Sequence, residues 1–497
     1  MSLLSNGIFL SFAGYLVMMI VIGGFFCRKN RSISEYLLGG RGLGSWVTAI
    51  SAQASDMSGW LLMGLPGAIY AGGMGDVWVA IGLALGTLLN WLLVAPRLRV
   101  YTEKTNALTL PSFFAERFRD PTGLLRVAGS IIILLFFTIY AASGLVAAGK
   151  LFDTMFRIDY RTAVLIGAAA ILVYTLLGGY LAVCWTDLIQ GMLMVFAIVV
   201  VPLVALRHAG STTGFGAGWQ AVLEAGAAKN LSLFPTAGNG LTVLAIVSCA
   251  VWGLGYFGQP HILSRFMSIR DVKLFPRSIT IAMIWVLISL LGAVVVAFVA
   301  MPLFPGLDAG EAEKVFIKMI VKFFPPWLGG ILLAAIMAAV MSTIDSQLMV
   351  SASALTEDFY RRVVRRTATV GEAVWVSRGF VAFIAVLATL IALFPSDTIF
   401  NIVKFAWGGF GAAFGPVVLM ALYSRRTTWY SALAGMIVGT AVMIAWYLLG
   451  WNRFMYEILP GFAANLLVIA VIDRIAPQKD PAVFAEYAAV KASVRLR

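Results

Sequence analysis

The chain has 497 residues, of which 61% are hydrophobic and 12% charged, and its mean hydropathy is +0.93. A soluble domain carries about 25% charged residues, so much of the surface of this protein must face lipid. This composition excludes a soluble enzyme. The formal net charge of +13 does not point to a nucleic-acid partner, because the basic residues lie in short loops between apolar runs, where they set membrane topology.

Runs of apolar residues recur along the chain, and about 20 such residues cross a ~30 Å hydrocarbon core as a helix. Counting the runs predicts an all-α polytopic membrane protein with about 13 transmembrane helices. Their approximate limits are 6–27, 43–70, 76–96, 124–149, 161–178, 181–206, 240–260, 278–302, 326–352, 374–394, 398–423, 429–450 and 455–473. No Lys or Arg precedes the first run, which is also too long for a signal peptide, so we expect a retained span.

The loops that are richest in Lys and Arg are the first, third, seventh, ninth and eleventh. They contain Arg28, Lys29, Arg31 and Arg41; Arg97, Arg99, Lys104, Arg117, Arg119 and Arg126; Arg265, Arg270, Lys273 and Arg277; Arg361, Arg362, Arg365 and Arg366; and Arg425 and Arg426. Because such loops stay in the cytoplasm, they predict an external N-terminus, a cytoplasmic C-terminus and an odd number of spans. Residues 208–239 are expected to form a long external loop, and residues 308–322 a short external surface helix.

Cysteine and histidine are rare in this chain. The cysteines are Cys27, Cys184 and Cys249, and the histidines are His208 and His261. This scattered supply is too small for a disulfide framework or a metal centre, so we expect no cofactor. No activated nucleophile or phosphate-binding loop is recognisable, so we do not expect an enzyme.

Two spans are interrupted by helix-weakening residues. The stretch around Met57 in the second span has a counterpart in residues 252–260 of the seventh. The interruptions are five spans apart, so the second must cross the membrane in the opposite sense, as in inverted-repeat transporters. We therefore expect one repeat over residues 43–206 (spans 2–6) and another over residues 207–423 (spans 7–11). Residues 1–42 would add one span and residues 424–497 two spans and a tail.

Asp56 stands within the second span, beside Ser58 and Gly59. An ionised group at mid-membrane costs several kcal/mol, so it normally faces a cavity or a partner. The Gly and Ser residues permit an unwound segment, whose freed carbonyls suit a sodium ion. The alternative is a helix–helix interface, in which small residues allow close packing. The acid favours a site.

A second polar patch lies in the ninth span and comprises Ser342, Thr343, Asp345 and Ser346. The hydroxyls could simply bond back to their own helix, but this does not explain Asp345. Asp187 in the sixth span is a third acid, near enough to the cytoplasmic end to be a solvated helix end. Lys404 in the eleventh span could pair with a carboxylate or extend to the interface. For Asp345, a second cation, a shared proton and an ion pair with Lys404 or a cytoplasmic Arg all remain open.

Aromatic side chains accompany the interruptions. Trp252 and Tyr256 precede Pro260 in the seventh span, and Tyr140 lies in the fourth. Aromatic residues in a span are usually packing residues or interfacial anchors. A Gly-broken aromatic segment that faces the first interruption could instead clasp a small amphipathic solute.

Several stretches together resemble the sodium/solute symporter family. They are SDMSGWLLMGLPGAIY, TNALTLPSFFAERF, TIYAASGLVA, YTLLGGYLAVCWTDLIQG, WGLGYFGQPHILSRFM and MAAVMSTIDSQLMVSASALTEDFY, and the resemblance covers nearly the whole chain. GYFGQPHILSRF is similar to the proline-transporting branch rather than to sugar, sialate or pantothenate members. The resemblance implies a 5+5 inverted-repeat core of the leucine-transporter-like fold, with extra spans, in a bacterial cytoplasmic membrane.

The resemblance also implies a sodium ion held between the second and ninth spans. Its ligands would be the carbonyls of Ala54, Met57 and Ala339 and the hydroxyls of Ser342 and Thr343. Asp56 matches an essential acid, Ser58 and Gly59 match coupling positions, and Tyr140, Trp252, Tyr256 and Pro260 match the proline pocket. Asp187 matches an acid that helps hold a second sodium in some relatives, with Asp345 and Ser346 as further candidates. Asp345 departs from the proline-transporting branch, in which an uncharged residue stands at this place.

The implied activity is sodium-coupled uptake of L-proline by alternating access. One charge that moves inward across 100 mV gains about 2.3 kcal/mol, enough to drive substantial accumulation. The alternatives are the same mechanism with another small solute or with protons, and a channel or sensor with a transporter-like core. An added signalling domain is not favoured, because the tail after residue 474 is short.

Overall fold

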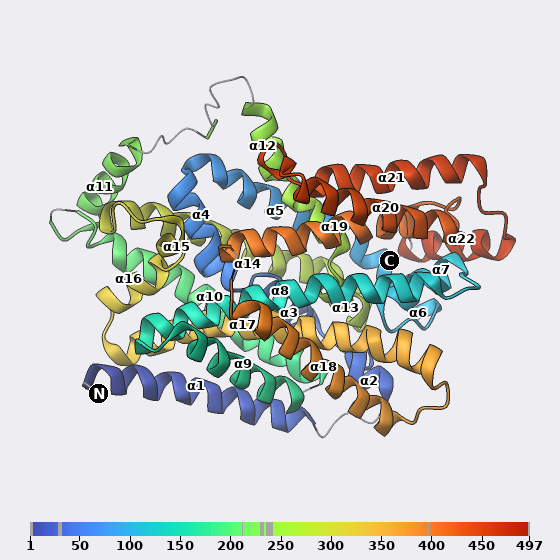
Figure 1. The fold of residues 1–497 in the computed structure, drawn as a ribbon, viewed down its shortest axis with the longest axis horizontal. Helices are drawn as coiled ribbons and strands as arrows, with labels where there is room; N and C mark the ends of the chain where they lie inside the picture. The colour runs from blue at the N-terminus through green and yellow to red at the C-terminus, as the bar shows by residue number, and fades with distance from the viewer. Residues whose placement is uncertain are drawn as a thin grey trace.

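The computed structural model describes residues 3–27, 32–177, 179–210, 212–228, 233–234, 242–395 and 397–495. Over these residues the regular elements are helices, apart from an isolated bridge between Leu43 and Ile269. The long helices lie side by side along the long axis of the molecule (Figure 1). Helix α1 (Leu3–Cys27) forms one edge, and α20 (Trp429–Leu448) and α21 (Ile458–Ile475) lie at the other.

Nine helices of the described chain are long and apolar enough to cross a membrane, and a bent helix pair adds a tenth. Three shorter apolar helices cover Gly7–Ile22, Trp60–Gly72 and Tyr160–Leu176. Together these segments fall where the sequence predicts spans, but three are short, so the count of thirteen stays a prediction. The remaining bounds are α3 Ser45–Asp56, α4 Leu65–Gly72, α5 Val77–Leu89, α6 Ala95–Lys104, α8 Leu124–Phe156, α9 Tyr160–Leu177, α10 Tyr180–Leu206, α12 Thr242–Ala250, α13 Pro260–Ser268, α14 Phe275–Leu303, α17 Pro326–Ala354, α18 Val370–Ala392 and α19 Ile399–Tyr423.

The second predicted span is broken where the sequence predicts an interruption. Helix α3 ends at Asp56, Met57 leaves the helical conformation with φ −86° and ψ 80°, and a π-helical turn over Trp60–Gly64 leads into α4. A Cβ atom on Gly59 would lie 2.7 Å from the Cβ of Ala147. Glycine is therefore needed here for α8 to approach the break closely.

The seventh predicted span is broken as well. Helix α12 continues as a 3₁₀ turn over Val251–Gly258, Gln259 is extended, and α13 starts at Pro260. The chain bends by 47° between the two halves. The sequence predicts that this span ends near residue 260 and that Arg265 lies in a cytoplasmic loop. That prediction is wrong, because Pro260 begins a further helix, as proline favours at a first helical position.

Helix α17 lies at the centre of the bundle. It packs against α1, α3, α8, α10 and α18. Almost all of its side chains from Gly329 to Ala354 are buried, including the polar patch around Ser342. A helix that is covered by protein on all sides needs no polar face. The patch therefore faces other helices rather than lipid.

Some predicted loops contain helices. The segment 208–239, predicted to be a long external loop, contains the helix α11 (Phe215–Ala228), because its alanines favour helix despite the glycines. Its external position stays a prediction. Residues 229–232 and 235–241 lie outside the described residues. Residues 308–322 lie largely in α15 (Ala309–Ala312) and α16 (Val315–Phe323), which confirms helix in that segment.

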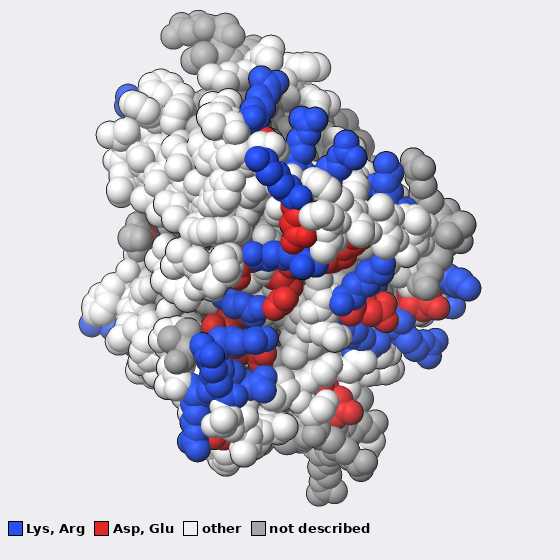
Figure 2. Space-filling view, turned by 90° about the vertical axis from the view of Figure 1, so that its right-hand side faces the viewer, with Lys and Arg blue, Asp and Glu red and all other residues white. Residues whose placement is uncertain are grey.

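The two ends of the bundle differ in charge. Helices α11 and α15 lie at one end, and α2 (Ile33–Leu38), α7 (Leu110–Phe118) and α22 (Pro481–Arg495) at the other (Figure 1). Lys and Arg side chains gather on this second end (Figure 2). A cavity of about 690 Å³ there is lined by Arg126, Arg361, Arg362 and Arg366, among others. Arg28, Lys29 and Arg31 of the first basic loop lie outside the described residues.

Candidate functional site

The two helix breaks meet at Asp56. The phenol of Tyr256 donates a hydrogen bond of 2.5 Å to its Oδ2 atom. Its backbone carbonyl accepts hydrogen bonds from the Tyr140 hydroxyl at 3.2 Å and from the Trp60 indole at 3.1 Å. All four residues are buried, and Oδ1 of Asp56 has no hydrogen-bond partner among the described residues. The acid and two of the predicted pocket aromatics thus form one cluster.

The predicted sodium ligands of α3 and α17 lie in direct contact. The Ser342 hydroxyl donates to the Ala54 carbonyl at 2.8 Å, and the Thr343 hydroxyl reaches the same oxygen at 3.5 Å. Ser342 also lies 3.2 Å from the carbonyl oxygen of Ala339 in its own helix. Met57 follows one turn later, at the buried end of α3. Carbonyl and hydroxyl oxygens are hard ligands, so their chemistry suits an alkali cation.

Ser58 and Gly59 lie in the break itself. The backbone N–H of Ser58 donates to the Asp56 carbonyl at 3.1 Å, and the Ser58 hydroxyl accepts from the Trp60 N–H at 3.4 Å. Together with the close approach of Gly59 to α8, these contacts hold the unwound segment in a defined shape.

The other two predicted pocket residues, Trp252 and Pro260, lie in the stretch that leads from α12 to α13. The Trp252 ring lies 5.0 Å from the ring of Phe400 and 5.2 Å from that of Tyr456. The Trp407 indole lies edge-on to Tyr256 at 5.0 Å and donates to the Trp252 carbonyl at 2.8 Å. Trp252 therefore packs into an aromatic layer with α19, whereas Tyr256 turns toward Asp56. Pro260, next in the chain, begins α13.

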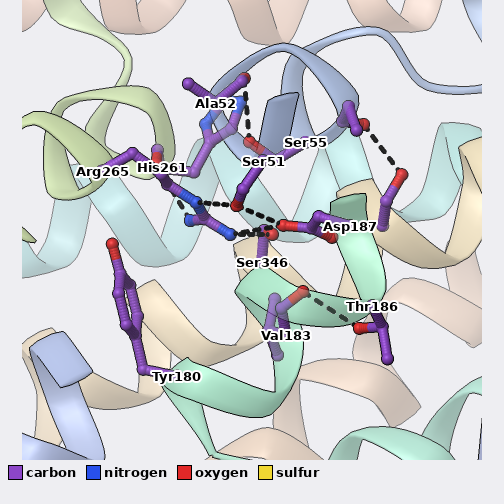
Figure 3. A network of polar contacts seen from close by, with 12 residues as sticks. Ser51, Ala52, Ser55, Tyr180, Val183, Thr186, Asp187, His261, Arg265 and Ser346 are labelled. Carbon is purple, nitrogen blue, oxygen red and sulfur yellow. Dashed lines mark hydrogen bonds and ion pairs between the residues drawn. The ribbon is translucent and has the colours of Figure 1, made fainter. Parts of the chain in front are cut away.

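Asp187 is paired with Arg265, a residue that the sequence places in a loop. Oδ2 of Asp187 lies 3.1 Å from Nη2 of Arg265 and accepts a 2.6 Å hydrogen bond from the Ser51 hydroxyl (Figure 3). The side chains of the pair are 0% and 1% exposed. A solvated helix end, one of the alternatives for Asp187, is therefore wrong.

Asp345 is also fully buried, in α17. Neither of its carboxylate oxygens has a hydrogen-bond partner of normal geometry within the described chain. Lys404 lies elsewhere, with its amino group 5.1 Å from the ring centre of Tyr456. Within the described residues, Asp345 forms no ion pair with Lys404 or with an arginine, and Arg265 pairs with Asp187 instead.

A further contact that the sequence does not predict lies at the α11 and α15 end. The buried carboxylate of Glu313 pairs with Lys150 of α8 at 2.6 Å. It also accepts from the first amides of α19, at Ile399 (3.2 Å) and Phe400 (3.1 Å). A Cβ atom on Gly67 of α4 would lie 2.9 Å from the Glu313 backbone. Glu313 therefore joins three spans through the segment between α14 and α17.

Some of these residues carry a detectable signal in the sequence. The run that follows Pro260 is long enough for a helix, and a lone Arg in its last turn is a candidate for burial against an intramembrane acid. Ser51 and Glu313 carry no such signal, because nothing near them in the sequence names their partners. The roles of Ser51 and Glu313 become visible only in the tertiary structure, which shows the residues of other helices that they contact.

Comparison with known proteins gives the same assignment over most of the chain. Residues 36–439 match the model of the sodium:solute symporter family. The chain is 46% identical to the sodium/proline symporter of Escherichia coli (strain K12) over 479 residues, which cover 95% of this chain and 94% of that protein. It is 45% identical to the high-affinity proline transporter PutP of Bacillus subtilis (strain 168), with 94% and 97% covered.

Solved structures show the same fold at low sequence identity. A sodium-coupled sialic acid symporter in an outward-open state superposes with a TM-score of 0.80 at 18% identity, covering 95% of this chain and 99% of that one. MhsT in complex with L-phenylalanine gives 0.52 at 13% identity, with 89% and 98% covered. The predicted all-α, leucine-transporter-like fold class is confirmed. On the match over residues 36–439 and these relatives, the chain belongs to the sodium:solute symporter family.

Proposed function

We propose that this protein takes up L-proline together with sodium by alternating access. The relatives that are 46% and 45% identical over nearly the whole chain carry proline in their names, and the first carries sodium as well. The observation that carries the proposal is the junction of the two helix breaks with α17. Asp56, Tyr256, Ala54 and Ser342 make this junction through two hydrogen bonds.

In this proposal, sodium binds to the carbonyls of Ala54, Met57 and Ala339 and the hydroxyls of Ser342 and Thr343. The ion takes up oxygens that now bond to one another across α3 and α17, so its binding draws the unwound segment onto α17. The cation then adds its own ligand bonds to the hydrogen-bonded contact between the two helices. This makes sodium binding and the shape of the break interdependent.

Proline binds on the other side of Asp56 in this proposal. Its carboxylate suits the free amides at the start of α13, where the helix dipole favours an anion. Its ring and imino group suit the aromatic faces of Tyr140, Trp252 and Tyr256, since a cation over such a face gains ~0.5–2 kcal/mol. Pro260 sets the start of α13. Ser58 and Gly59 connect the two ligands, because they lie between the sodium oxygens and the aromatic cluster.

We place the inverted repeats at residues 43–206 and 207–423, with residues 1–42 and 424–497 outside them. The positively charged end of the bundle is assigned to the cytoplasm, because basic residues are retained there (Figure 2). The N-terminus is then external, the C-terminus cytoplasmic, and Glu313 belongs to the external side. The membrane is a bacterial cytoplasmic membrane, as the bacterial relatives suggest.

Counterflow of labelled L-proline in proteoliposomes tests this function. Vesicles loaded with unlabelled proline should accumulate the label transiently in sodium and not in choline or potassium. Excess unlabelled proline should abolish the signal, whereas sialic acid, glucose or pantothenate should not. Equal counterflow without sodium but with a proton gradient would show that protons, rather than sodium, are the coupling ion. Conductance that does not depend on the solute would indicate a channel.

A further inference from the structure

The Arg265 guanidinium lies at the meeting point of four helices. Its Nη2 atom contacts Asp187 of α10 at 3.1 Å and donates to the Ser346 hydroxyl of α17 at 2.5 Å. Its Nε atom donates to the Ser51 hydroxyl of α3 at 3.1 Å. Arg265 itself belongs to α13, behind the second helix break (Figure 3). This one charge therefore bridges the two interrupted spans, α10 and α17.

The remaining contacts of the guanidinium are also satisfied. Nη1 donates to the His261 carbonyl at 3.0 Å and to the Ser264 hydroxyl at 3.3 Å. The ring of Tyr180 lies 5.2 Å from the guanidinium carbon. A buried charge with this many partners is held in one place, and removal of a partner leaves an uncompensated charge in a low-dielectric interior.

The oxygens around Arg265 are those that a small cation would use. Asp187, Ser51 and Ser346 offer one carboxylate and two hydroxyls, a hard oxygen set. In addition, Oδ1 of Asp187 and both oxygens of Asp345 have no hydrogen-bond partner among the described residues. Asp187 contacts the guanidinium directly, and the buried Asp345 directly precedes Ser346 in α17. The cluster holds acceptor capacity for more positive charge than Arg265 alone supplies.

This cluster lies directly beside the proposed sodium site. Ser51 precedes Ala54 by three residues in α3, and Ser346 follows Ser342 by four in α17. Such spacings place side chains one turn apart on the same face, about 5–6 Å along the helix. Both positions therefore lie between the same two helices, one occupied by an arginine and the other lined by uncharged oxygens.

We propose that Arg265 is a built-in cation that occupies a second cation position next to the sodium site and so limits coupling to one sodium per proline. It determines the cation number, and it does so without touching either substrate. This inference rests on the proposed function. It assigns Asp187 and Ser346 to the guanidinium rather than to a mobile sodium ion.

The test replaces the guanidinium and counts cations. In wild type, sodium-dependent proline uptake should have a Hill coefficient of about one; in Arg265→Gln it should rise toward about two, as a second sodium takes the place of the guanidinium beside Asp187. The double variant Arg265→Gln/Asp187→Asn also removes the carboxylate that Arg265 neutralises in wild type. Its Hill coefficient should return to about one. Arg117→Gln is the matched control, because Arg117 is equally buried but donates to the carbonyls of Ala421 and Ser424.

A second measurement does not depend on transport. Sodium should raise the unfolding temperature of purified Arg265→Gln more steeply than that of wild type, the double variant or Arg117→Gln, with choline as the reference salt. This readout stands even if proline is not the solute, so failure of the proposed function and failure of this inference are distinguishable. A merely structural arginine would lower stability without adding sodium dependence.

Three outcomes would overturn the inference. The first is a Hill coefficient near two, or two charges moved per proline by reversal potential, in wild type. The second is an Arg265→Gln variant that folds and shows the same sodium dependence as wild type in both assays. The third is equal extra sodium binding in the Arg265→Gln/Asp187→Asn double variant. If Arg265→Gln does not fold, the wild-type reversal potential decides, with one charge per proline supporting the inference.

Discussion

The phenol of Tyr256 donates a hydrogen bond of 2.5 Å to the carboxylate of Asp56, across 200 residues of chain. Each residue lies at the break of its own span, so the bond joins the two interruptions to each other. No other hydrogen bond to the Asp56 carboxylate is present within the described chain. The position of this buried acid therefore depends on Tyr256.

Removal of this bond should weaken the response to sodium. A hydrogen bond to a charged group contributes about 1.5–3 kcal/mol, which corresponds to a change of roughly tenfold to a hundredfold in an equilibrium constant. Tyr256→Phe, which removes this bond, should raise the sodium concentration for half-maximal proline uptake by about tenfold, and Asp56→Asn, which removes the negative charge although its amide oxygen can still accept from Tyr256, by at least as much. Sodium titration of labelled uptake in proteoliposomes measures this. A normal sodium response in Asp56→Asn would show that the acid has no part in coupling.

The hydroxyls of Ser342 and Thr343 should matter for sodium and much less for proline. Both contact the Ala54 carbonyl, so Ser342→Ala and Thr343→Ala should each raise the half-saturating sodium concentration, by about fivefold to tenfold for a loss of ~1 kcal/mol. Ser353→Ala is the control, because this hydroxyl only bonds back to Met349 in the same helix. If both variants keep wild-type sodium dependence, the ion binds elsewhere.

Truncation of Trp252 should weaken proline binding. Its ring belongs to an aromatic layer beside Tyr256, and loss of a ring face removes ~0.5–2 kcal/mol of attraction for a cationic imino group. Trp252→Ala should therefore raise the proline concentration for half-maximal uptake at saturating sodium by about threefold to thirtyfold. Trp446→Ala, which removes an indole of α20 outside the repeats, should leave it unchanged. Competition by unlabelled proline at fixed sodium measures both, and unaltered competition in Trp252→Ala would exclude the aromatic clasp.

Glu313 should hold the external side closed. Its carboxylate bonds to Lys150 and to the first amides of α19, and a buried amide left without a partner costs about 1–3 kcal/mol. In a background without native cysteines, Glu313→Ala should speed thiol labelling of a cysteine placed at Ala68, which lines the cavity of about 400 Å³ beside Glu313.

Glu311→Ala serves as the control for that labelling experiment. Glu311 lies in the same segment, but Lys314 and Lys318 on the surface are its partners, and they lower its pKa to about 2. Glu311 thus lies in the same segment as Glu313, but its ion-pair partners belong to that segment and not to α19. Equal labelling rates in Glu313→Ala and Glu311→Ala would contradict a closing role for Glu313.

Topology is tested by labelling from either side. Single cysteines placed at Ser5 and Arg425 should react with a membrane-impermeant maleimide from opposite faces, because we propose that the basic end of the bundle lies in the cytoplasm. Intact cells and inside-out vesicles supply the two faces. Labelling of both positions from the same face would rule out an odd number of spans.

The fold was largely predictable because its determinants are local. Apolar runs mark the positions of the spans, and the Gly- and Pro-containing stretches at Met57 and Gln259 mark the two breaks, since helix-breaking residues act where they stand. The mistakes lie where a helix continues without a strong apolar signal. The sequence predicts a loop at α13, because that segment carries Arg265, and at α11, because its glycines weaken the helical signal of its alanines.

The sequence by itself determined that the chain crosses a membrane, where its spans break, and which acids and hydroxyls lie inside them. Only the tertiary structure decided which of these groups meet. Asp187 pairs with Arg265 rather than with water, and Asp56 bonds to Tyr256, because the packing of α3, α10, α13 and α17 brings distant residues together. A charge in a low-dielectric interior is stabilised only by a partner within a few ångströms. Sequence spacing cannot supply that distance between residues of different helices.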